Sequence, residues 1–258
     1  TLLLKALQWS IFRNFEKNLL TYSADDKTPQ LFEDHFGKDP EKRKIILETP
    51  TKPPTIEQLE LRKLTRKVNF NDHLDFERKE FMFSDLIQKL CNQYDGFNEV
   101  GRKITCGLLK LIKSPIAEKR VSQLGSYVQT EMQYHHGENS IQESIFSMGF
   151  VDVGGVQLPL VILIGNGGTR GCGGSKHGSA RYVNVIPNKP LLNALFPRDL
   201  IAFAKDKLED GIAAEKEILM GIIPRGICES VEIPSNGYKI KIHARDVFSV
   251  INNVKGNI

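Results

Sequence analysis

The sequence contains few cysteines and no long apolar run. Its four cysteines, Cys91, Cys106, Cys172 and Cys228, are widely separated and form no CxxC pair, so we expect no disulfide framework, no zinc site and a reducing, intracellular compartment. No apolar stretch reaches about 18 residues, which predicts that no helix spans a membrane and that no membrane is a partner. Because the chain starts without methionine and without the layout of a signal peptide, we expect it to be part of a longer polypeptide.

Acidic residues are absent from a long central stretch. No Asp or Glu lies between Val153 and Arg198. Five basic residues lie within this stretch or at its end: Arg170, Lys176, Arg181, Lys189 and Arg198. The whole chain carries a net charge of only +4, which permits nucleic acid as a partner without demanding it. A local concentration of positive charge nevertheless attracts a polyanion.

The centre of that stretch is a glycine-rich loop, residues 165–182, which follows a buried-strand pattern at residues 158–164. Glycine tolerates positive φ and lets the backbone approach a ligand closely. The loop ends in Arg181 and Tyr182, and a phenol with a pKa near about 10 becomes a useful nucleophile when a neighbouring cation stabilises its phenolate. On these residues alone, a flexible loop whose tyrosine starts the next strand is the competing interpretation.

Apolar spacing predicts helices on both sides of this loop. We expect helices at residues 2–20, 40–48, 56–67, 83–92, 100–113, 121–132 and 198–216. Ser140 and Glu143 form a capping-box pattern that predicts another helix start. Residues 238–245 alternate as a strand with one apolar and one basic face. Three short helices followed by β-rich sequence are typical of a winged helix-turn-helix domain.

Residues 134–138 (YHHGE) place two histidines beside a glutamate. Adjacent side chains diverge on any regular backbone, so a metal site is the less favoured interpretation. A histidine that donates a hydrogen bond to a phosphate oxygen, or to a developing oxyanion, fits the pattern better. We therefore predict no metal ligands in this chain.

Four motifs occur in a fixed order: residues 95–97 (DGF) with Arg102-Lys103, then 134–138 (YHHGE), then 168–174 (GTRGCGG), then Arg181-Tyr182. They resemble the DNA breakage–reunion region of type IIA DNA topoisomerases, in which the patterns are roughly DGxKPxQRK, YHHGE and FGTRxxGGKDAAxxRY. The resemblance covers nearly the whole chain. Residues 98–101 (NEVG), where the family has KPxQ, make it most similar to the enzymes of large DNA viruses.

The resemblance implies an α+β fold with three parts. Residues 1–84 would be a helical connector that follows a TOPRIM domain. Residues 85–205 would form a CAP-like winged helix-turn-helix domain with the nucleophilic tyrosine. Residues 206–258 would begin a β-rich tower domain.

The resemblance also implies a mechanism. Tyr182 would attack a DNA phosphodiester, form a reversible 5′-phosphotyrosyl link and free a 3′-hydroxyl. Arg181 and Arg102 would neutralise charge at the scissile phosphate. His136 would hydrogen-bond the same region or assist proton transfer.

Further basic residues match the positions that hold the DNA backbone in the family. Lys103, Arg170 and Lys176 are predicted phosphate contacts, which position DNA without reading its sequence. One departure affects Lys176: the family's GGKD reads GGSKH at residues 173–177. The lysine is thus displaced by one position, and the aspartate is missing.

The family inserts an apolar side chain between base pairs and bends the duplex. By similarity we predict Ile233 or Pro234 as this wedge, with Val231 as a third candidate and an ordinary β-turn as the alternative. Lys239 and Lys241 lie on the basic face of the predicted strand and would line the floor beneath the DNA. A solvated edge strand is the competing interpretation.

The sequence contains neither a DxD-type acidic cluster nor a GK[ST] nucleotide-binding loop. The resemblance implies that Mg²⁺ and ATP serve the full-length enzyme and bind outside this chain. The partners it implies are double-stranded DNA, the TOPRIM and ATPase domains of the same polypeptide, and a second copy in a homodimer. It also implies the host cytoplasm, at viral replication sites, or the nucleus as the compartment.

Two other functions compete with a topoisomerase. One is a non-catalytic winged-helix protein that binds duplex DNA and in which Tyr182 is structural. The other is a nucleotide-binding enzyme that uses the glycine-rich loop, but no GxGxxG spacing opens a helix after the strand.

Overall fold

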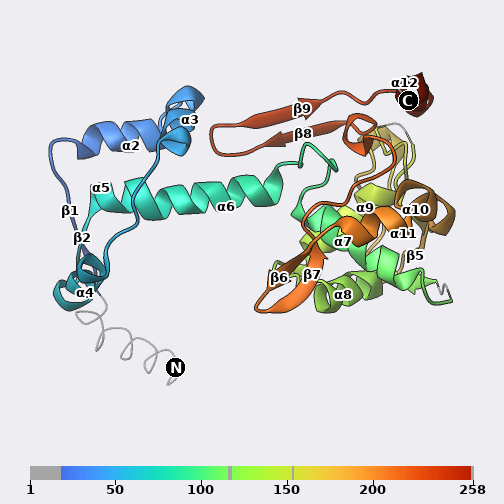
Figure 1. Ribbon diagram of the computed structural model, residues 1–258, viewed down its shortest axis with the longest axis horizontal. Helices are drawn as coiled ribbons and strands as arrows, with labels where there is room; N and C mark the ends of the chain where they lie inside the picture. The colour runs from blue at the N-terminus through green and yellow to red at the C-terminus, as the bar shows by residue number, and fades with distance from the viewer. Residues whose placement is uncertain (1–18, 116–117, 153, 257–258) are drawn as a thin grey trace. The chain divides into compact units, whose positions relative to one another are not determined.

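The computed structural model describes residues 19–115, 118–152 and 154–256, and the helix predicted at residues 2–20 falls almost wholly outside them. The chain forms two compact units (Figure 1). The first contains the chain up to Leu86 together with Ser235–Tyr238, and the second contains Ile87–Pro234 together with Lys239–Ile258. Among the described helices, none combines the length and the apolar character that a bilayer crossing requires. The division after residues 84 and 205 that the resemblance implies stays a prediction.

The first unit is built from helices and one parallel strand pair. Strand β1 (Thr21–Ser23) pairs with β2 (Lys67–Asn69). The helices are α2 (Thr28–Phe36), α3 (Pro40–Glu48), α4 (Ile56–Thr65), α5 (Phe70–Asp72), the π-helical η1 (His73–Arg78) and α6 (Lys79–Lys89). The Asp39 carboxylate accepts the Glu41 N–H at the start of α3, and Thr55 forms a capping box with Gln58 at the start of α4. The predicted helices at 40–48 and 56–67 are therefore confirmed.

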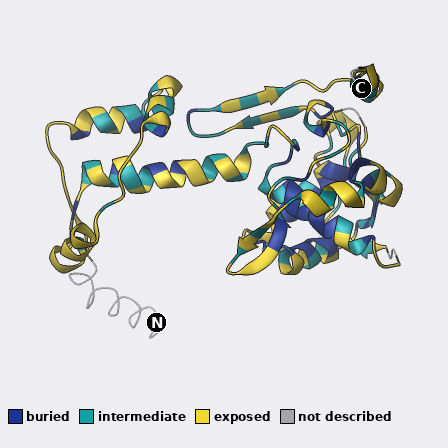
Figure 2. Ribbon diagram, viewed as in Figure 1, coloured by how far each residue is buried: buried dark blue, intermediate teal, exposed yellow. Residues whose placement is uncertain are grey.

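The second unit contains three helices packed on a small antiparallel sheet. The helices are α7 (Glu99–Leu111), α8 (Val121–Glu131) and α9 (Glu138–Gly149). The strands are β3 (Lys119–Arg120), β4 (Val161–Ile164) and β5 (Asn184–Pro187), in the order β3-β5-β4. Ile104, Leu124 and Ile141, one from each helix, are among its fully buried residues, and Figure 2 shows the buried surface concentrated here. This confirms the α+β, winged-helix prediction.

The helix predicted at residues 198–216 is wrong. Helix α10 (Lys189–Leu195) is followed by the short α11 (Arg198–Phe203), and the chain then forms a hairpin of β6 (Asp206–Glu209) and β7 (Ile212–Lys216). The turn consists of Asp210 and Gly211, with φ of 51° and 79°, the conformation that an Asp-Gly pair favours between strands. The charged alternation that looked like a solvated helix face is a β-strand pattern, and it buries Glu215.

The capping box predicted at Ser140 is also wrong. Helix α9 begins two residues earlier, with Gly137 as N-cap, and the Ser140 N–H already donates to the Gly137 carbonyl. Glu138 supplies the acidic residue of the first turn, which the helix dipole favours.

The C-terminal part contains a second hairpin, β8 (Val231–Pro234) with β9 (Lys239–Ile242), and a final helix α12 (Val247–Gly256). The strand predicted at 238–245 is thus shorter than expected, and its isoleucines are half-buried rather than buried. The turn of this hairpin belongs to the first unit. There, Ser235 Oγ donates to Asp85 Oδ2 at 2.7 Å.

Candidate functional site

Tyr182 lies in the turn between the glycine-rich loop and β5, and it is 79% exposed. Its own N–H donates to the Ser179 carbonyl at 2.8 Å. Its near neighbours Ala180 and Val183 are buried. The phenol therefore projects from a short turn whose flanking residues are anchored in the core.

The anchoring is made by backbone hydrogen bonds to the start of α8. The Ser122 N–H donates to the Ala180 carbonyl and the Val121 N–H to the Val183 carbonyl, both at 3.0 Å. These N–H groups belong to the first turn of a helix and have no partner within the helix itself. The positions of α8 and of the tyrosine turn are therefore fixed together.

The glycine-rich loop closes on itself. The Thr169 N–H donates to the Ser175 carbonyl and the Gly174 N–H to the Thr169 carbonyl, both at 3.1 Å, around the single turn η2 (Arg170–Cys172). Gly174 has φ of 89°, and a Cβ there would lie 2.8 Å from the Phe150 ring. Only glycine fits that position, because the loop backbone packs directly on an aromatic side chain.

His177 attaches the loop to α9. Its ring stacks on Phe146 with centroids 3.7 Å apart. Its Nε2 lies 2.9 Å from Glu143 Oε2, and its Nδ1 lies 2.9 Å from the Gly178 carbonyl. Partial burial lowers the pKa of His177, but the hydrogen bonds to Gly178 and Glu143 raise it by more, so its pKa lies above the ordinary value.

Acidic side chains from outside the acid-free stretch reach this loop. Glu143 contacts His177, and the Asp152 carboxylate lies 3.5 Å from Arg170 Nε. The expectation of a purely basic loop therefore needs correction, because two of its cationic positions face carboxylates contributed by neighbouring segments.

Arg102 lies on α7 and is buried beside Asp95. Its Nε donates to Asp95 Oδ2 at 2.6 Å, and its Nη2 donates to Asp95 Oδ1 at 3.1 Å and to the Phe97 carbonyl at 3.2 Å. The Asp95 carboxylate also accepts the N–H groups of Phe97 and Leu219. The guanidinium is thus held rigidly, and its orientation is set by the DGF turn.

Lys103, the next residue on α7, is fully buried. Its Nζ lies 2.7 Å from carboxylate oxygens of both Glu209 and Glu215. This does not agree with the prediction of a phosphate contact, because an ammonium group enclosed by carboxylates has no side that faces DNA.

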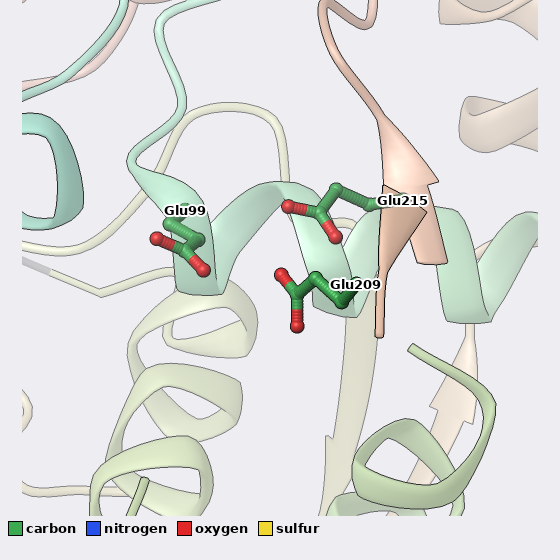
Figure 3. Close-up of side chains that lie close together, drawn as sticks. All are labelled: Glu99, Glu209 and Glu215. Atoms are coloured by element: carbon green, nitrogen blue, oxygen red, sulfur yellow. The ribbon is translucent and has the colours of Figure 1, made fainter. Parts of the chain in front are cut away.

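Glu99, Glu209 and Glu215 form the one carboxylate cluster among the described residues with metal-ligand spacing (Figure 3). Two ammonium groups already lie within it. Lys103 pairs with Glu209 and Glu215, and Lys207 Nζ lies 3.2–3.3 Å from a carboxylate oxygen of each of the three. The arrangement is that of a network of ion pairs.

His136 is exposed, and its ring contacts that of buried Tyr134 edge-on at 5.4 Å. It lines a cavity of about 360 Å³ together with Asn98 at the start of α7 and Ile233 of β8. The YHHGE segment, the residue that caps α7 and the predicted wedge therefore meet at one hollow.

A second cavity, of about 420 Å³, joins the other motifs. Its walls include the DGF turn at residues 96–98, loop residues 173–175, His177 and, again, Ile233. Three of the four sequence motifs thus border two cavities that share the Ile233 side chain. Tyr182 and Arg181 line neither of these two cavities and lie in the turn described above.

The remaining predicted DNA contacts lie on the β8–β9 hairpin. Lys239 and Lys241 pair with Glu232 at 2.6 and 3.6 Å. Pro234 is exposed, whereas Ile233 is half-buried. Lys176 is exposed in the loop, where it adopts a positive φ of 59°.

Several residues that shape the site were missed by sequence reasoning. Asp95 was assigned no role, and Glu143, Glu209 and Glu215 were read as surface charges or parts of a cap. The only local signal was Glu99, which precedes Lys103 by four residues, the spacing of a helical ion pair. The other partners lie more than 30 residues away in sequence, and no spacing rule reaches them.

Comparisons with known proteins agree with this geometry. Residues 90–258 match the family model that describes the A-type chain of DNA gyrase/topoisomerase IV. The DNA topoisomerase 2 of African swine fever virus (isolate Pig/Kenya/KEN-50/1950) is 32% identical over 250 residues, which cover 96% of this chain and 21% of that protein. The DNA topoisomerase 2 of Saccharomyces cerevisiae is 29% identical over 190 residues, which cover 74% and 13%.

The fold agrees as well. The crystal structure of the DNA-binding, cleavage and re-ligation domain of Plasmodium falciparum topoisomerase II matches with a TM-score of 0.74 at 23% identity, over 96% of this chain and 33% of that one. The chain spans about a fifth of the length of the viral relatives. The resemblance to type IIA topoisomerases of large DNA viruses is confirmed, and the chain belongs to the DNA gyrase/topoisomerase IV family.

Proposed function

We propose that this chain is the DNA breakage–reunion part of a type II topoisomerase and that Tyr182 is its nucleophile. The phenolate oxygen attacks a backbone phosphorus, the bond from phosphorus to the 3′-oxygen breaks, and the 3′-oxygen takes up a proton. The product is a 5′-phosphotyrosyl ester, which the 3′-hydroxyl reverses. The observation that carries the proposal is the exposed Tyr182 phenol on a turn anchored to α8.

Three further residues are proposed to act at the phosphate. Arg181 neighbours the tyrosine and neutralises its phenolate. Arg102 would present its Nη1 end, for which the described hydrogen bonds provide no partner, while Asp95 holds the other two nitrogens. His136 would donate to a phosphate oxygen from the rim of its cavity. The loss of one such donor typically costs about 10²–10³ in rate.

The DNA itself would be held by exposed basic and apolar groups. Arg170 and Lys176 on the loop and Lys239 and Lys241 on β9 are proposed phosphate contacts. For the wedge, Pro234 is the more exposed candidate, and Ile233 is the one beside His136.

Mg²⁺ and ATP are proposed to bind elsewhere in the full-length protein. The only candidate ligand cluster among the described residues, at Glu99, Glu209 and Glu215, does not suit Mg²⁺, because Lys103 and Lys207 already neutralise it. No step of the cleavage reaction is therefore assigned to a metal held by this chain.

The proposal extends to the whole enzyme. Its TOPRIM and ATPase domains and a second copy in a homodimer would complete the site and allow ATP-dependent passage of one duplex through another. The relatives from a large DNA virus favour viral replication sites in the host cytoplasm, or the nucleus, as the compartment.

The test uses the full-length enzyme with supercoiled duplex DNA and SDS trapping. The unchanged enzyme should yield covalently linked protein–DNA, and Tyr182→Phe should yield none while it binds duplex DNA normally. Tyr94→Phe, at another exposed tyrosine, is the matched control and should trap DNA normally. Trapping by Tyr182→Phe, or none by the unchanged enzyme, would instead support a non-catalytic DNA-binding protein.

A further inference from the structure

The ammonium group of Lys103 is fully used by acceptors within the protein. Its side chain is 1% exposed. It donates to Glu209 Oε1 and Glu215 Oε2 at 2.7 Å and to the Met132 carbonyl at 2.8 Å. An ammonium group carries three N–H donors. All three are accounted for, and none remains for a phosphate.

The surrounding charges explain why the lysine stays there. Three carboxylates, from Glu99, Glu209 and Glu215, place acceptor oxygens within 4.8 Å of one another. Their repulsion in a partly buried site is offset by the ammonium groups of Lys103 and Lys207. A buried ion pair of this kind is strongly destabilising when only one partner is removed. The network therefore fastens the β6–β7 hairpin to α7.

The third acceptor connects the network to the YHHGE segment. Met132 is the C-cap residue of α8, four residues before His136. The same segment is held by a hydrogen bond from the Tyr134 N–H to the Gln129 carbonyl at 3.1 Å. In addition, His135 Nε2 lies 3.7 Å from Glu209 Oε2. Lys103 and Glu209 together thus touch both sides of the point where His136 leaves α8.

We infer that Lys103 is a positioning residue that sets the place of His136, by joining the end of α8 to the β6–β7 hairpin. This inference rests on the proposed cleavage function of the chain. It replaces the phosphate contact that the motif alone predicts for Lys103. The hairpin, in turn, serves as a support for the segment that carries the histidine.

The experiment removes the lysine without changing the net charge. Lys103→Met combined with Glu215→Gln deletes one cation and one anion of the same pair, so long-range attraction to DNA is preserved. Lys110→Met combined with Glu131→Gln is the matched control on the same helix, because that ion pair is exposed. All variants are made in the full-length enzyme, and their melting temperatures are recorded.

For the Lys103 variant we expect the single-turnover rate of covalent-complex formation to fall about 10- to 100-fold, the scale of a small displacement of a reacting group. The Kd for duplex DNA and its dependence on salt should stay unchanged. Hydrogen exchange in residues 132–137 should accelerate. The control pair should change none of these quantities.

Other results would overturn the inference. A phosphate contact would weaken duplex binding and reduce the slope of log K against log salt by about one. A purely structural lysine would lower the melting temperature and leave the rate of the folded enzyme unchanged. Glu209→Gln serves if the double variant does not fold: it should slow cleavage several-fold, and an unchanged rate contradicts the inference.

The proposed function is tested separately in the same series. If the unchanged enzyme forms no covalent complex through Tyr182, the cleavage function fails, whatever the Lys103 variant does. If it forms that complex and the Lys103 variant matches it in rate, only the positioning role fails.

Discussion

Arg102 and Asp95 form a two-point ion pair inside the second unit, with Nε–Oδ2 at 2.6 Å and Nη2–Oδ1 at 3.1 Å. The Asp95 side chain is completely buried. It also accepts N–H groups from its own turn and from Leu219, far along the chain. One carboxylate thus orients the proposed phosphate-binding arginine and joins the turn before α7 to the segment after β7.

Asp95→Asn should therefore reduce both stability and cleavage. Asparagine keeps the size of the side chain but leaves the buried guanidinium without a counter-charge, which costs about 3–5 kcal/mol for a buried pair. Denaturant unfolding measures this loss, and SDS trapping measures the fall in cleavage. Asp210→Asn, in the exposed β6–β7 turn where asparagine also tolerates the positive φ, is the control and should change neither.

Gly96→Ala should be among the most destabilising single substitutions in the DGF turn. Gly96 has φ of +68°, and an added Cβ would lie 2.3 Å from the Gly226 Cα, a backbone atom that cannot rotate away. The strain and the overlap together should cost about 2–4 kcal/mol. Gly171→Ala is the comparison, since a Cβ there meets nothing within 4 Å. Equal unfolding midpoints for the two variants would show that the turn does not pack as described.

Much of the fold follows from local sequence patterns. The helices at 40–48, 56–67 and 121–132 have clear apolar spacing, and Asp39 and Thr55 mark starts that the structure shows as caps. The region at 198–216 failed because alternating charges fit a solvated helix as well as a strand. The Asp210-Gly211 pair was the turn signal that decides between them.

The site was predictable only in part, for a physical reason. Motifs identify the groups that face a substrate, such as Tyr182 and His136. The residues that hold those groups depend on tertiary contacts: Glu143 reaches His177 across 34 positions, and Glu215 reaches Lys103 across 112. Long-range ion pairs of this kind leave no periodic trace in a single sequence.

The contact between His177 and Glu143 should make the loop's attachment depend on pH. Because the pKa of His177 is raised in the folded protein, the contact stabilises most below the unfolded value of about 6.5. This stabilisation is lost as the pH rises through the higher folded pKa. Glu143→Gln should therefore lower the melting temperature relative to the unchanged protein at about pH 6 and have less effect at about pH 9. A difference that is constant over this range would contradict the role of the imidazolium.

Thiol labelling can locate the DNA on the glycine-rich loop. Cys172 is exposed within the loop, whereas Cys106 is buried and its pKa is raised to about 11 by burial. Since the thiolate is the reactive form, iodoacetamide at about pH 8 should modify Cys172 first and spare Cys106. Bound duplex DNA should slow the labelling of Cys172, because the proposed contacts Arg170 and Lys176 flank it on either side. Mass spectrometry of the labelled peptides measures both rates, and Cys172→Ser should abolish the fast phase. Labelling of Cys172 at the same rate with and without saturating DNA would place the duplex elsewhere on the protein.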